Sequence, residues 1–455
     1  MPALTSLPCS TWSRTAADAV SSALAAAVFA FLDVADVLLC LVYGVLDGIL
    51  EDSPVGCYCH RSYDSAAVAM EDEEVSDTLY VRRSAFRDAL TGLLRRLVVR
   101  RRGAPEKSEP CKGRSPRWSD CGCASCGAWR GNDGGRLHFV VKEPAPKDAA
   151  GTQSGSDHEH STDDAAIFIH GFTSSSSFWA ETVFSMLSCR LFAVDLLGFG
   201  KSPKPANCMY RLKDHVEAIE RSLVELLDLS SFHLVSHSMG CIIALALAAR
   251  YPTRVKSITL VAPSVDRVRC LQPYFLPCEQ KASQVALSRL AEKKLWPPLL
   301  FGSAVMSWYE HIGRTVCFFV CKNHLVWEWL FKLLTRKRDV DFRVRDLTKH
   351  THHSAWHTMH NVICGGAGLQ DRNLEAVEAA GIPVQVIHGV KDQVVSVECS
   401  HHLKAKLPRA EVRLMGGCDH TTVVLGREKG FVEELRAFWS RSASRYDHGA
   451  QANGC

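Results

Sequence analysis

Short apolar runs separated by stretches of helical character dominate the chain from residue 165 onward. Continuous apolar runs of this length are typical of strands buried on both faces, and the longer segments between them are typical of covering helices. The alternation therefore predicts a mostly parallel sheet that is covered on both sides. The predicted strands are 166–170 (AIFIH), 190–195 (RLFAVD), 232–236 (FHLVS), 257–262 (SITLVA), 384–389 (VQVIHG) and 411–416 (EVRLMG).

Two helices and an edge strand complete the predicted sheet domain. Residues 241–252 (CIIALALAARYP) predict a helix whose alanines allow close packing on the sheet and which Pro252 stops. Residues 431–439 (FVEELRAFW) place their apolar side chains on one helical face and should close the domain. Residues 136–141 (RLHFVV) alternate well enough to form an edge strand that opens it.

The alternation breaks down between Ala262 and Gly381, where aromatic residues, histidines and basic residues are crowded together. About 100 residues without the sheet pattern are too many for an ordinary loop. We expect a mainly helical cap, inserted over the carboxyl edge of the sheet, where such sheets bind ligands.

The N-terminal region is apolar but interrupted. Residues 19–32 carry no charge and residues 37–46 are again apolar, but three aspartates lie among or beside these runs (Asp33, Asp36 and Asp47). A helix that spans a membrane needs roughly 20 nearly unbroken apolar residues, so a simple spanning helix is disfavoured. We rank a signal sequence first, then an uncleaved anchor, then a hydrophobic hairpin in the membrane interface, and a buried helical pair of a soluble domain stays possible.

These patterns divide the chain into six segments. They are an N-terminal signal or anchor region (1–50), a variable linker rich in cysteine and arginine (51–134), the first part of the sheet domain (135–264), the helical cap (265–380), the second part of the sheet domain (381–440) and a flexible tail (441–455). The polar stretch between residues 103 and 164 should be mostly loop.

Charge argues against a nucleic-acid partner, because a net charge of +4 over 455 residues gives no general attraction to phosphate. The basic run at 95–103 is best explained as a solvated face or linker, with an anionic-lipid patch as the alternative.

Nineteen cysteines do not decide between disulfides and reduced thiols. The cluster at 121–126 (CGCASC) is similar to a zinc knuckle, but no second C-x-x-C pair completes it at the usual spacing. We therefore favour a surface loop with one disulfide, and we predict no metal and no cofactor.

Ser238 is the candidate nucleophile. It lies in the stretch LVSHSMGCII (234–243), where a predicted strand meets a predicted helix, and Gly240 supplies the small residue that a sharp strand-to-helix turn requires. Ser236 stands where the usual G-x-S-x-G pattern has its first glycine, and a serine is small enough to fit there.

A serine hydroxyl needs a base and an acid that orients the base, and in this kind of sheet they follow the serine in the order acid, histidine. Asp392 follows one predicted strand, and His420 follows the next within GGCDHTTVV. Asp266 and Asp419 are the rival acids, but Asp419 adjoins the base and is better explained as a residue that caps its loop.

The oxyanion formed in acyl transfer needs preorganised donors. We expect the backbone N–H groups of Met239 and Phe172 to serve, and His170 and Gly171 to allow close approach of the backbone and to line the substrate site. The serines at 174–177 are assigned to turn and helix-cap chemistry. The loop 195–205 (DLLGFGKSPKP) lacks the spacing of a phosphate loop and is not a nucleotide site.

Three histidines in the cap share one helical face, namely His353, His357 and His360. Their spacing could hold zinc, but no carboxylate or cysteine obviously joins them. We favour a polar or pH-sensitive lid face.

Together these motifs give a chain that resembles the α/β-hydrolases and, more narrowly, the plant BODYGUARD family of probable lysophospholipases. The resemblance covers roughly residues 135–439. It depends on the motifs IHGFTSSSSFWAETVF, DLLGFGKSPKP, SHSMGC, THHSAWHTMHNVICGG, HGVKDQVV and GCDHTTVV. It implies a secreted protein, facing the cell wall or bound to the plasma membrane, that acts on lipid or polyester acyl esters in cuticle formation.

Three functions stay open on the residues. The first is a serine esterase or lipase-like hydrolase that works through an acyl-enzyme, the second is an acyltransferase with the same triad, and the third is a receptor or scaffold that keeps the fold without turnover. Haloalkane or epoxide chemistry would need an aspartate at the position of Ser238 and is excluded. A lipid or acyl-ester substrate at a membrane or cell-wall surface is the expected partner.

Overall fold

The computed structural model describes residues 10–51, 75–76, 79, 117–130, 135–144, 165–265, 306 and 308–452. The chain divides into two compact units. One contains residues 1–62, 80–106 and 272–315, and the other contains residues 63–79, 107–271 and 316–455.

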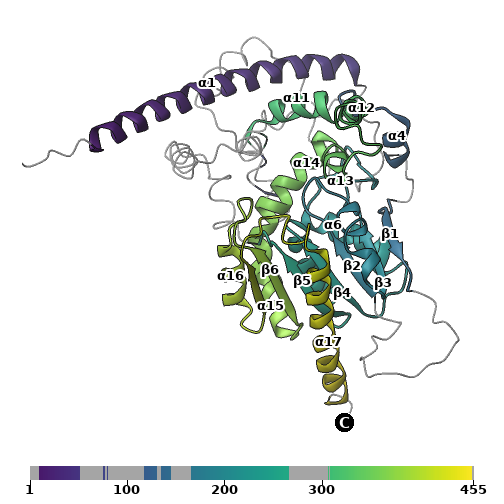
Figure 1. Ribbon diagram of the computed structural model, residues 1–455. Coiled ribbons are helices and arrows are strands. Elements are labelled where there is room, and N and C mark those ends of the chain that lie inside the picture. The colour runs from purple at the N-terminus through teal and green to yellow at the C-terminus, as the bar shows by residue number, and fades with distance from the viewer. Residues whose placement is uncertain are drawn as a thin grey trace, which may run out of the picture. The chain divides into compact units, whose positions relative to one another are not determined.

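The larger unit contains a seven-stranded sheet of order β1-β3-β2-β4-β5-β6-β7 (Figure 1). β1 pairs antiparallel to β3, and all the other neighbours are parallel. Every strand predicted from the apolar runs is present, and the prediction of a mostly parallel α/β-hydrolase sheet is confirmed. The strands are β1 (Phe139–Lys142), β2 (Ala165–Ile169), β3 (Arg190–Val194), β4 (Phe232–His237), β5 (Val255–Val261), β6 (Val384–Gly389) and β7 (Glu411–Met415).

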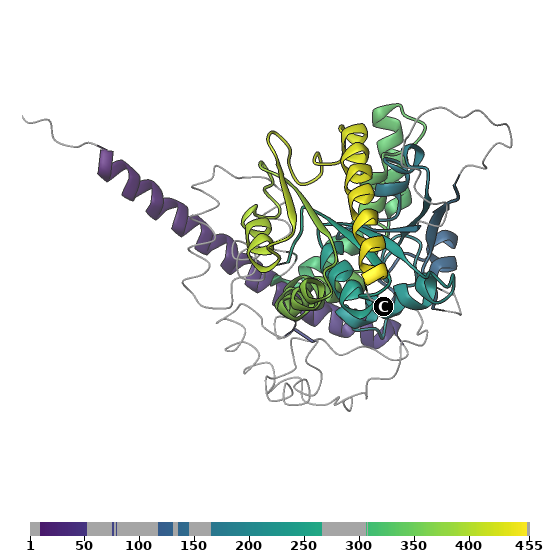
Figure 2. The same ribbon diagram turned by 90° about the horizontal axis from the view of Figure 1, so that it is seen from below.

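Helices cover both faces of this sheet because the strand side chains alternate between two apolar cores (Figures 1 and 2). In β2, Ile167 and Ile169 enter one core and Phe168 enters the other. The first core is covered by α6 (Leu212–Ile219), α7 (Gly240–Arg250), α15 (Gln370–Ala379) and α16 (Glu398–Lys406). The second is covered by α5 (Ser177–Ala180), η4 (Phe184–Met186) and α17 (Glu428–Ala452).

The segment between β5 and β6 is mainly helical where the structure describes it. It contains α11 (Glu310–Val320), α12 (His324–Thr335), α13 (Phe342–Leu347), α14 (His352–Thr358), η6 (Met359–Gly365) and η7 (Gly366–Leu369). The last helix before β6, α15, packs on α7 and belongs to the layer that covers the sheet, although the cap was expected to run to residue 380. Much of the early part of that cap, 266–305, lies outside the described residues.

Two other expected segments differ from the structure. Residues 124–130 of the expected linker form the short helix α4 (Ala124–Arg130). The closing helix α17 continues to Ala452, so most of the expected tail after residue 440 is helical.

The smaller unit contains α1 (Ser10–Leu50), a single continuous helix, which contradicts the hairpin that the sequence analysis ranked third. All three aspartates that interrupt its apolar sequence are paired, and Asp33 accepts from the hydroxyl of Tyr309 at 2.7 Å. Arg314 donates to both carboxylate oxygens of Asp47 at 2.6 Å, and the backbone N–H of His311 donates to Asp36 at 2.9 Å. Across the described residues, no helix combines the length and apolarity needed to cross a bilayer.

Candidate active site

Ser238 occupies a sharp turn between β4 and α7. Its φ is 55°, in the left-handed region that a non-glycine residue adopts only when the surroundings enforce it. Its N–H donates to the carbonyl of Val261 at 2.8 Å, which ties the turn to the end of β5. A Cβ added at Gly240 would lie 2.6 Å from the carbonyl oxygen of His170, so only glycine fits there.

The serine at position 236 fits where a glycine is more usual. The Ser236 side chain is buried behind the turn, and its Oγ lies 3.4 Å from both the Sγ of Cys241 and the carbonyl oxygen of Thr259. It therefore points away from the nucleophile and leaves the turn intact.

The hydroxyl of Ser238 makes no hydrogen bond to any residue that the structure describes, and the residue is 8% exposed. Gly171 comes very close to it, since a Cβ at Gly171 would be 3.1 Å from the Cβ of Ser238. The loop after β2 therefore faces the candidate nucleophile directly, as the sequence predicted.

Asp392 and His420 meet at the ends of β6 and β7. His420 donates from Nδ1 to Oδ2 of Asp392 at 2.8 Å, and the carboxylate is completely buried. The backbone N–H groups of Val394 and Val395 each donate to its other oxygen at 2.8 Å. Burial raises the pKa of Asp392, but hydrogen bonds from His388 and His420 outweigh it and hold the pKa well below its usual range. The carboxylate therefore stays ionised and fixes the orientation of His420.

His388 is a second partner of this carboxylate that the sequence analysis did not identify. Its Nε2 lies 3.1 Å from Oδ2 of Asp392 and 3.2 Å from the carbonyl of Val395, so this nitrogen faces two acceptors and carries a proton. Its Nδ1 accepts from the hydroxyl of Ser400 at 2.6 Å. The signal was present in HGVKD, where a histidine precedes the acid by four residues.

His237 links the serine turn to the histidine loop. Its Nε2 donates to the backbone carbonyl of His420 at 2.9 Å, and its ring stacks on Phe178 with centroids 4.8 Å apart. Burial and the neighbouring His420 lower the pKa of His237 to about 3, so it stays neutral. His420 is thus held beside the residue that precedes Ser238. Within the described residues, the Ser238 hydroxyl and the His420 imidazole are not joined by a hydrogen bond.

The expected oxyanion donors lie on either side of the nucleophile. His170 is fully buried: its Nε2 accepts from the N–H of Leu196 at 2.9 Å, so its Nδ1 carries the proton and donates to the carbonyl of Gly171 at 2.6 Å. In the trans peptide between Gly171 and Phe172, the carbonyl and the N–H point in opposite directions. Because the carbonyl of Gly171 faces His170, the N–H of Phe172 points away from His170. Among the described residues, neither this N–H nor that of Met239 has an acceptor.

The His170 ring was expected to line the substrate site. Because it is enclosed and both of its nitrogens are engaged, it instead positions the loop that carries Phe172.

The rival acids are placed differently. Asp419 accepts from the backbone N–H groups of Thr421 and Thr422 at 3.0 and 2.9 Å, so it caps its own loop as expected. Asp266 lies outside the described residues.

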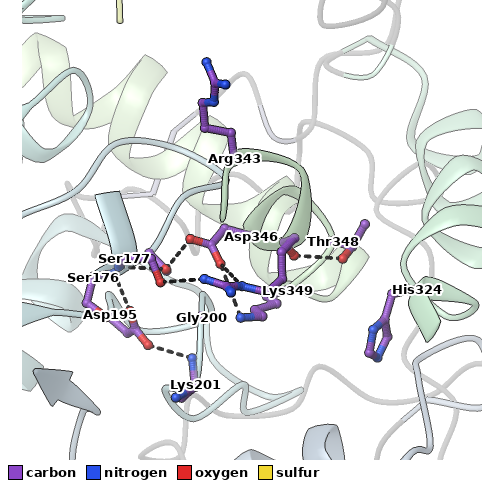
Figure 3. Close-up of polar contacts among 12 residues, drawn as sticks. Ser176, Ser177, Asp195, Gly200, Lys201, His324, Arg343, Asp346, Thr348 and Lys349 are labelled. Atoms are coloured by element: carbon purple, nitrogen blue, oxygen red, sulfur yellow. Dashed lines mark hydrogen bonds and ion pairs between the residues drawn. The ribbon is translucent and has the colours of Figure 1, made fainter. Parts of the chain in front are cut away.

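The serine run after the oxyanion loop does more than cap a helix (Figure 3). Ser175 donates its hydroxyl to the buried carboxylate of Asp346 in α13, and Arg345 donates to the hydroxyl of Ser177 at 3.2 Å. The N–H of Ser176 donates to Asp195 at 2.6 Å, which fastens the loop after β3 to the same place. The cap helix α13 is therefore bonded to the loop that follows the oxyanion donor.

The three cap histidines are not a lid face. His353, His357 and His360 are all buried, and Nε2 of His353 donates to the carbonyl of Cys208 at 2.9 Å. The predicted polar or pH-sensitive lid face does not agree with this burial, because α14 and η6 lie within the packed unit.

Among the residues that the structure describes, two groups of cysteine and histidine side chains could hold a metal ion. One comprises Cys121, Cys123, Cys126 and His324, and the other comprises Cys317, Cys321 and His350. None of the three cysteines of the first cluster forms a disulfide, so the expected loop with a disulfide is wrong.

Comparison with known proteins gives a consistent result. The family model described as "alpha/beta hydrolase fold" matches residues 165–291. The chain is 46% identical to "Probable lysophospholipase BODYGUARD 4" of Arabidopsis thaliana, over 92% of this chain and 97% of the relative. It is 40% identical to "Probable lysophospholipase BODYGUARD 5" of the same plant, over 96% of this chain and 99% of the relative. A third relative, "Probable lysophospholipase BODYGUARD 1", is 38% identical over 92% and 96% of the two chains.

Proposed function

The chain belongs to the BODYGUARD family of α/β-hydrolases, and from this premise we propose that it is a serine hydrolase that cleaves the acyl ester of lysophospholipids or related lipids. The observation that carries the proposal is the position of Ser238: it is held at a φ of 55° between strand and helix, with the Asp392 and His420 pair beside it. The relatives are probable lysophospholipases, which supports the lipid class of the substrate.

In the proposed reaction Ser238 attacks the ester carbonyl while His420 takes its proton through Nε2. Asp392 keeps the proton of His420 on Nδ1, so that Nε2 is the free base, and it stabilises the imidazolium that forms. The N–H groups of Phe172 and Met239 bind the negative charge on the carbonyl oxygen. His420 then protonates the leaving alcohol oxygen; for a lysophospholipid the deacylated glycerophosphodiester departs and the acyl group stays on Ser238.

Water completes the cycle by attacking the acyl-enzyme, with His420 again acting as base. An acceptor hydroxyl in place of water would transfer the acyl group instead, through the same residues. The product therefore distinguishes a hydrolase from an acyltransferase.

A lipid substrate also agrees with the surface of α12. This helix exposes large apolar side chains, including Trp329 at 62% and Leu334 at 71% exposure. Exposed basic residues follow it immediately, at Arg336, Lys337 and Arg338. An apolar helix flanked by cations is typical of a surface that enters an anionic lipid interface. We propose that α12 is the face that the cap presents to a lipid surface.

The wider setting follows from the family resemblance. We propose that the protein acts in the secretory pathway, at the cell wall or plasma membrane, in cuticle formation. Sequencing the first residue of the mature protein from plant tissue tests this: a chain that begins after residue 19–32 supports export, whereas an intact Met1 on protein confined to the cell interior contradicts it.

The enzymatic proposal is tested with purified full-length protein. Wild type should react with a fluorophosphonate probe at Ser238 and release fatty acid from lysophosphatidylcholine, and Ser238→Ala should lose at least about 10⁴-fold in kcat. The matched control is Ser236→Gly, which changes a serine two residues away and should keep both activities. Absence of labelling in wild type would contradict the proposal and favour a receptor or scaffold. Adding glycerol as acceptor reveals transfer if acylglycerol replaces free fatty acid.

Lipid binding by α12 is tested with vesicles of phosphatidylcholine and phosphatidylglycerol. The variant Trp329→Ser should bind them more weakly than wild type while keeping activity on a soluble ester. Equal sedimentation with vesicles would contradict the assignment of α12.

A further inference from the structure

Three cysteines and one histidine, distant in sequence, converge in the larger unit. Cys121 and Cys123 lie just before α4, Cys126 lies in its first turn, and His324 is the first residue of α12. Their four ligand atoms all lie within 4.8 Å of one another. The sequence separation of Cys123 and His324 is 201 residues, so only the tertiary fold brings them together.

The distances in this cluster match a tetrahedral metal site. The Nε2 of His324 lies 3.4 Å from the Sγ of Cys123 and 3.5 Å from the Sγ of Cys126. Zinc binds sulfur at about 2.3 Å and imidazole nitrogen at about 2.0 Å, and tetrahedral geometry then puts the two ligand atoms about 3.5 Å apart. These two separations match the spacing of ligand atoms around a bound zinc ion.

The surroundings support the same ligands. The N–H of Cys123 donates to the Sγ of Cys121, and the N–H of Cys126 donates to the Sγ of Cys123, both at 3.5 Å. Such bonds favour thiolates, the form of cysteine that binds metal. On the other side of the ring, Nδ1 of His324 contacts a carboxylate oxygen of Glu328 at 3.0 Å. Such a contact orients a metal-binding imidazole and makes its other nitrogen a more basic metal ligand.

The segment that carries the cysteines is docked on the cap rather than free. Lys322 donates to the carbonyl of Trp118 at 2.8 Å, and the ring of Trp118 packs edge-on against Phe318 at 5.5 Å. A disulfide would engage at most two of the three cysteines and would not explain why the imidazole of His324 lies beside them.

We propose that the chain binds a structural zinc ion through Cys121, Cys123, Cys126 and His324. Mixed sulfur and nitrogen ligands suit zinc, and four protein ligands leave no open position for substrate or water, which is the mark of a structural site. The ion cross-links residues 121–126 to α12, the helix proposed to face lipid. Binding displaces the thiol protons, so three thiolates and one neutral imidazole hold the metal.

A second set of ligands comprises Cys317 in α11, Cys321 just after it, and His350 between α13 and α14. Cys317 and Cys321 are one helical turn apart and buried, and Nε2 of His350 lies 3.7 and 3.6 Å from their sulfur atoms. From this separate geometry we infer a second zinc site with three protein ligands. Its test is the variant Cys321→Ser, which should remove one equivalent of zinc; a zinc content equal to that of wild type overturns the second site.

The main experiment measures zinc by mass spectrometry in full-length protein purified without a metal-affinity column. Wild type should retain zinc, and Cys123→Ser/Cys126→Ser should contain one equivalent less. Cys189→Ser, a partly buried cysteine outside both clusters, is the matched control and should keep the full content. Cobalt added to metal-free wild type should give the sulfur-to-cobalt charge-transfer bands of a tetrahedral thiolate site, and these bands should weaken in the double variant.

A variant outside the ligands keeps the proposal testable if the double variant fails to fold. Glu328→Ala removes only the carboxylate that contacts His324 and should weaken zinc affinity by about 10–100-fold in competition with a chelator. Wild type without zinc, an unchanged zinc content in the double variant, or a disulfide among the three cysteines each overturns the first site. These measurements need no enzyme activity, so their failure is distinct from failure of the proposed hydrolase.

Discussion

Replacing Asp392 by asparagine removes a charge from a carboxylate that is completely buried. Its Oδ1 accepts two backbone N–H groups at 2.8 Å, and its Oδ2 accepts from His420 at 2.8 Å and from His388 at 3.1 Å. An amide can satisfy the backbone donors only through its oxygen. The NH₂ group of asparagine must then face the two imidazoles.

That orientation forces the wrong tautomer on His420. An NH₂ group donates, so Nδ1 of His420 has to accept and the imidazole proton moves to Nε2, which then cannot take the proton of Ser238. In serine hydrolases this kind of change costs about 10⁴-fold in kcat. Since each tenfold corresponds to about 1.36 kcal/mol of activation free energy, the expected loss is about 5.4 kcal/mol. KM should change much less, because the acid does not touch the substrate.

The assay is steady-state hydrolysis of lysophosphatidylcholine at pH 7, with thermal unfolding recorded for each variant to show that it is folded. Asp419→Asn is the matched control: the carboxylate is next to the base but only caps its loop, so kcat should stay within a few-fold of wild type. A loss of less than tenfold in folded Asp392→Asn, or an equal loss in Asp419→Asn, would refute the assignment of the acid.

Three further predictions concern stability. Gly240→Ala places a Cβ 2.6 Å from a backbone carbonyl oxygen and should lower the free energy of unfolding in urea by about 1–3 kcal/mol. The control Gly430→Ala in α17, where the nearest atom is 3.8 Å from the added Cβ, should not lower it. Equal losses in the two variants would contradict the packing argument. Burial raises the pKa of Asp195, but its hydrogen bonds outweigh this and hold the pKa below the unfolded value, so its stabilisation is present above about pH 4 and is lost as the pH falls further. Asp195→Asn should therefore flatten the acid limb of a stability profile, and an unchanged limb would count against this. Asp47→Ala leaves Arg314 buried without its bidentate partner and should destabilise the full-length protein by about 3–5 kcal/mol. Denaturant unfolding measures this loss, and an unchanged midpoint would show that α1 does not contribute to stability.

The sequence by itself determined the elements of the sheet and the order of the candidate site residues along it. Apolar runs such as 166–170 and 384–389 have the length and composition typical of strands covered on both faces, and the short S-x-S-x-G stretch around Ser238 is typical of a strand-to-helix turn. Because parallel strands end at one edge, placing Asp392 and His420 after successive strands was enough to predict that they would meet.

Only the tertiary structure decided which residues from distant segments converge. The sequence around Cys121 does not predict its proximity to His324, and the apolar N-terminal sequence does not predict the ion pair between Asp47 and Arg314. The same holds for His237, whose bond to the backbone of His420 crosses 183 residues of sequence. Local patterns report the preferences of neighbours one or two turns apart, whereas these contacts depend on how whole helices and loops pack, which is a property of the folded chain.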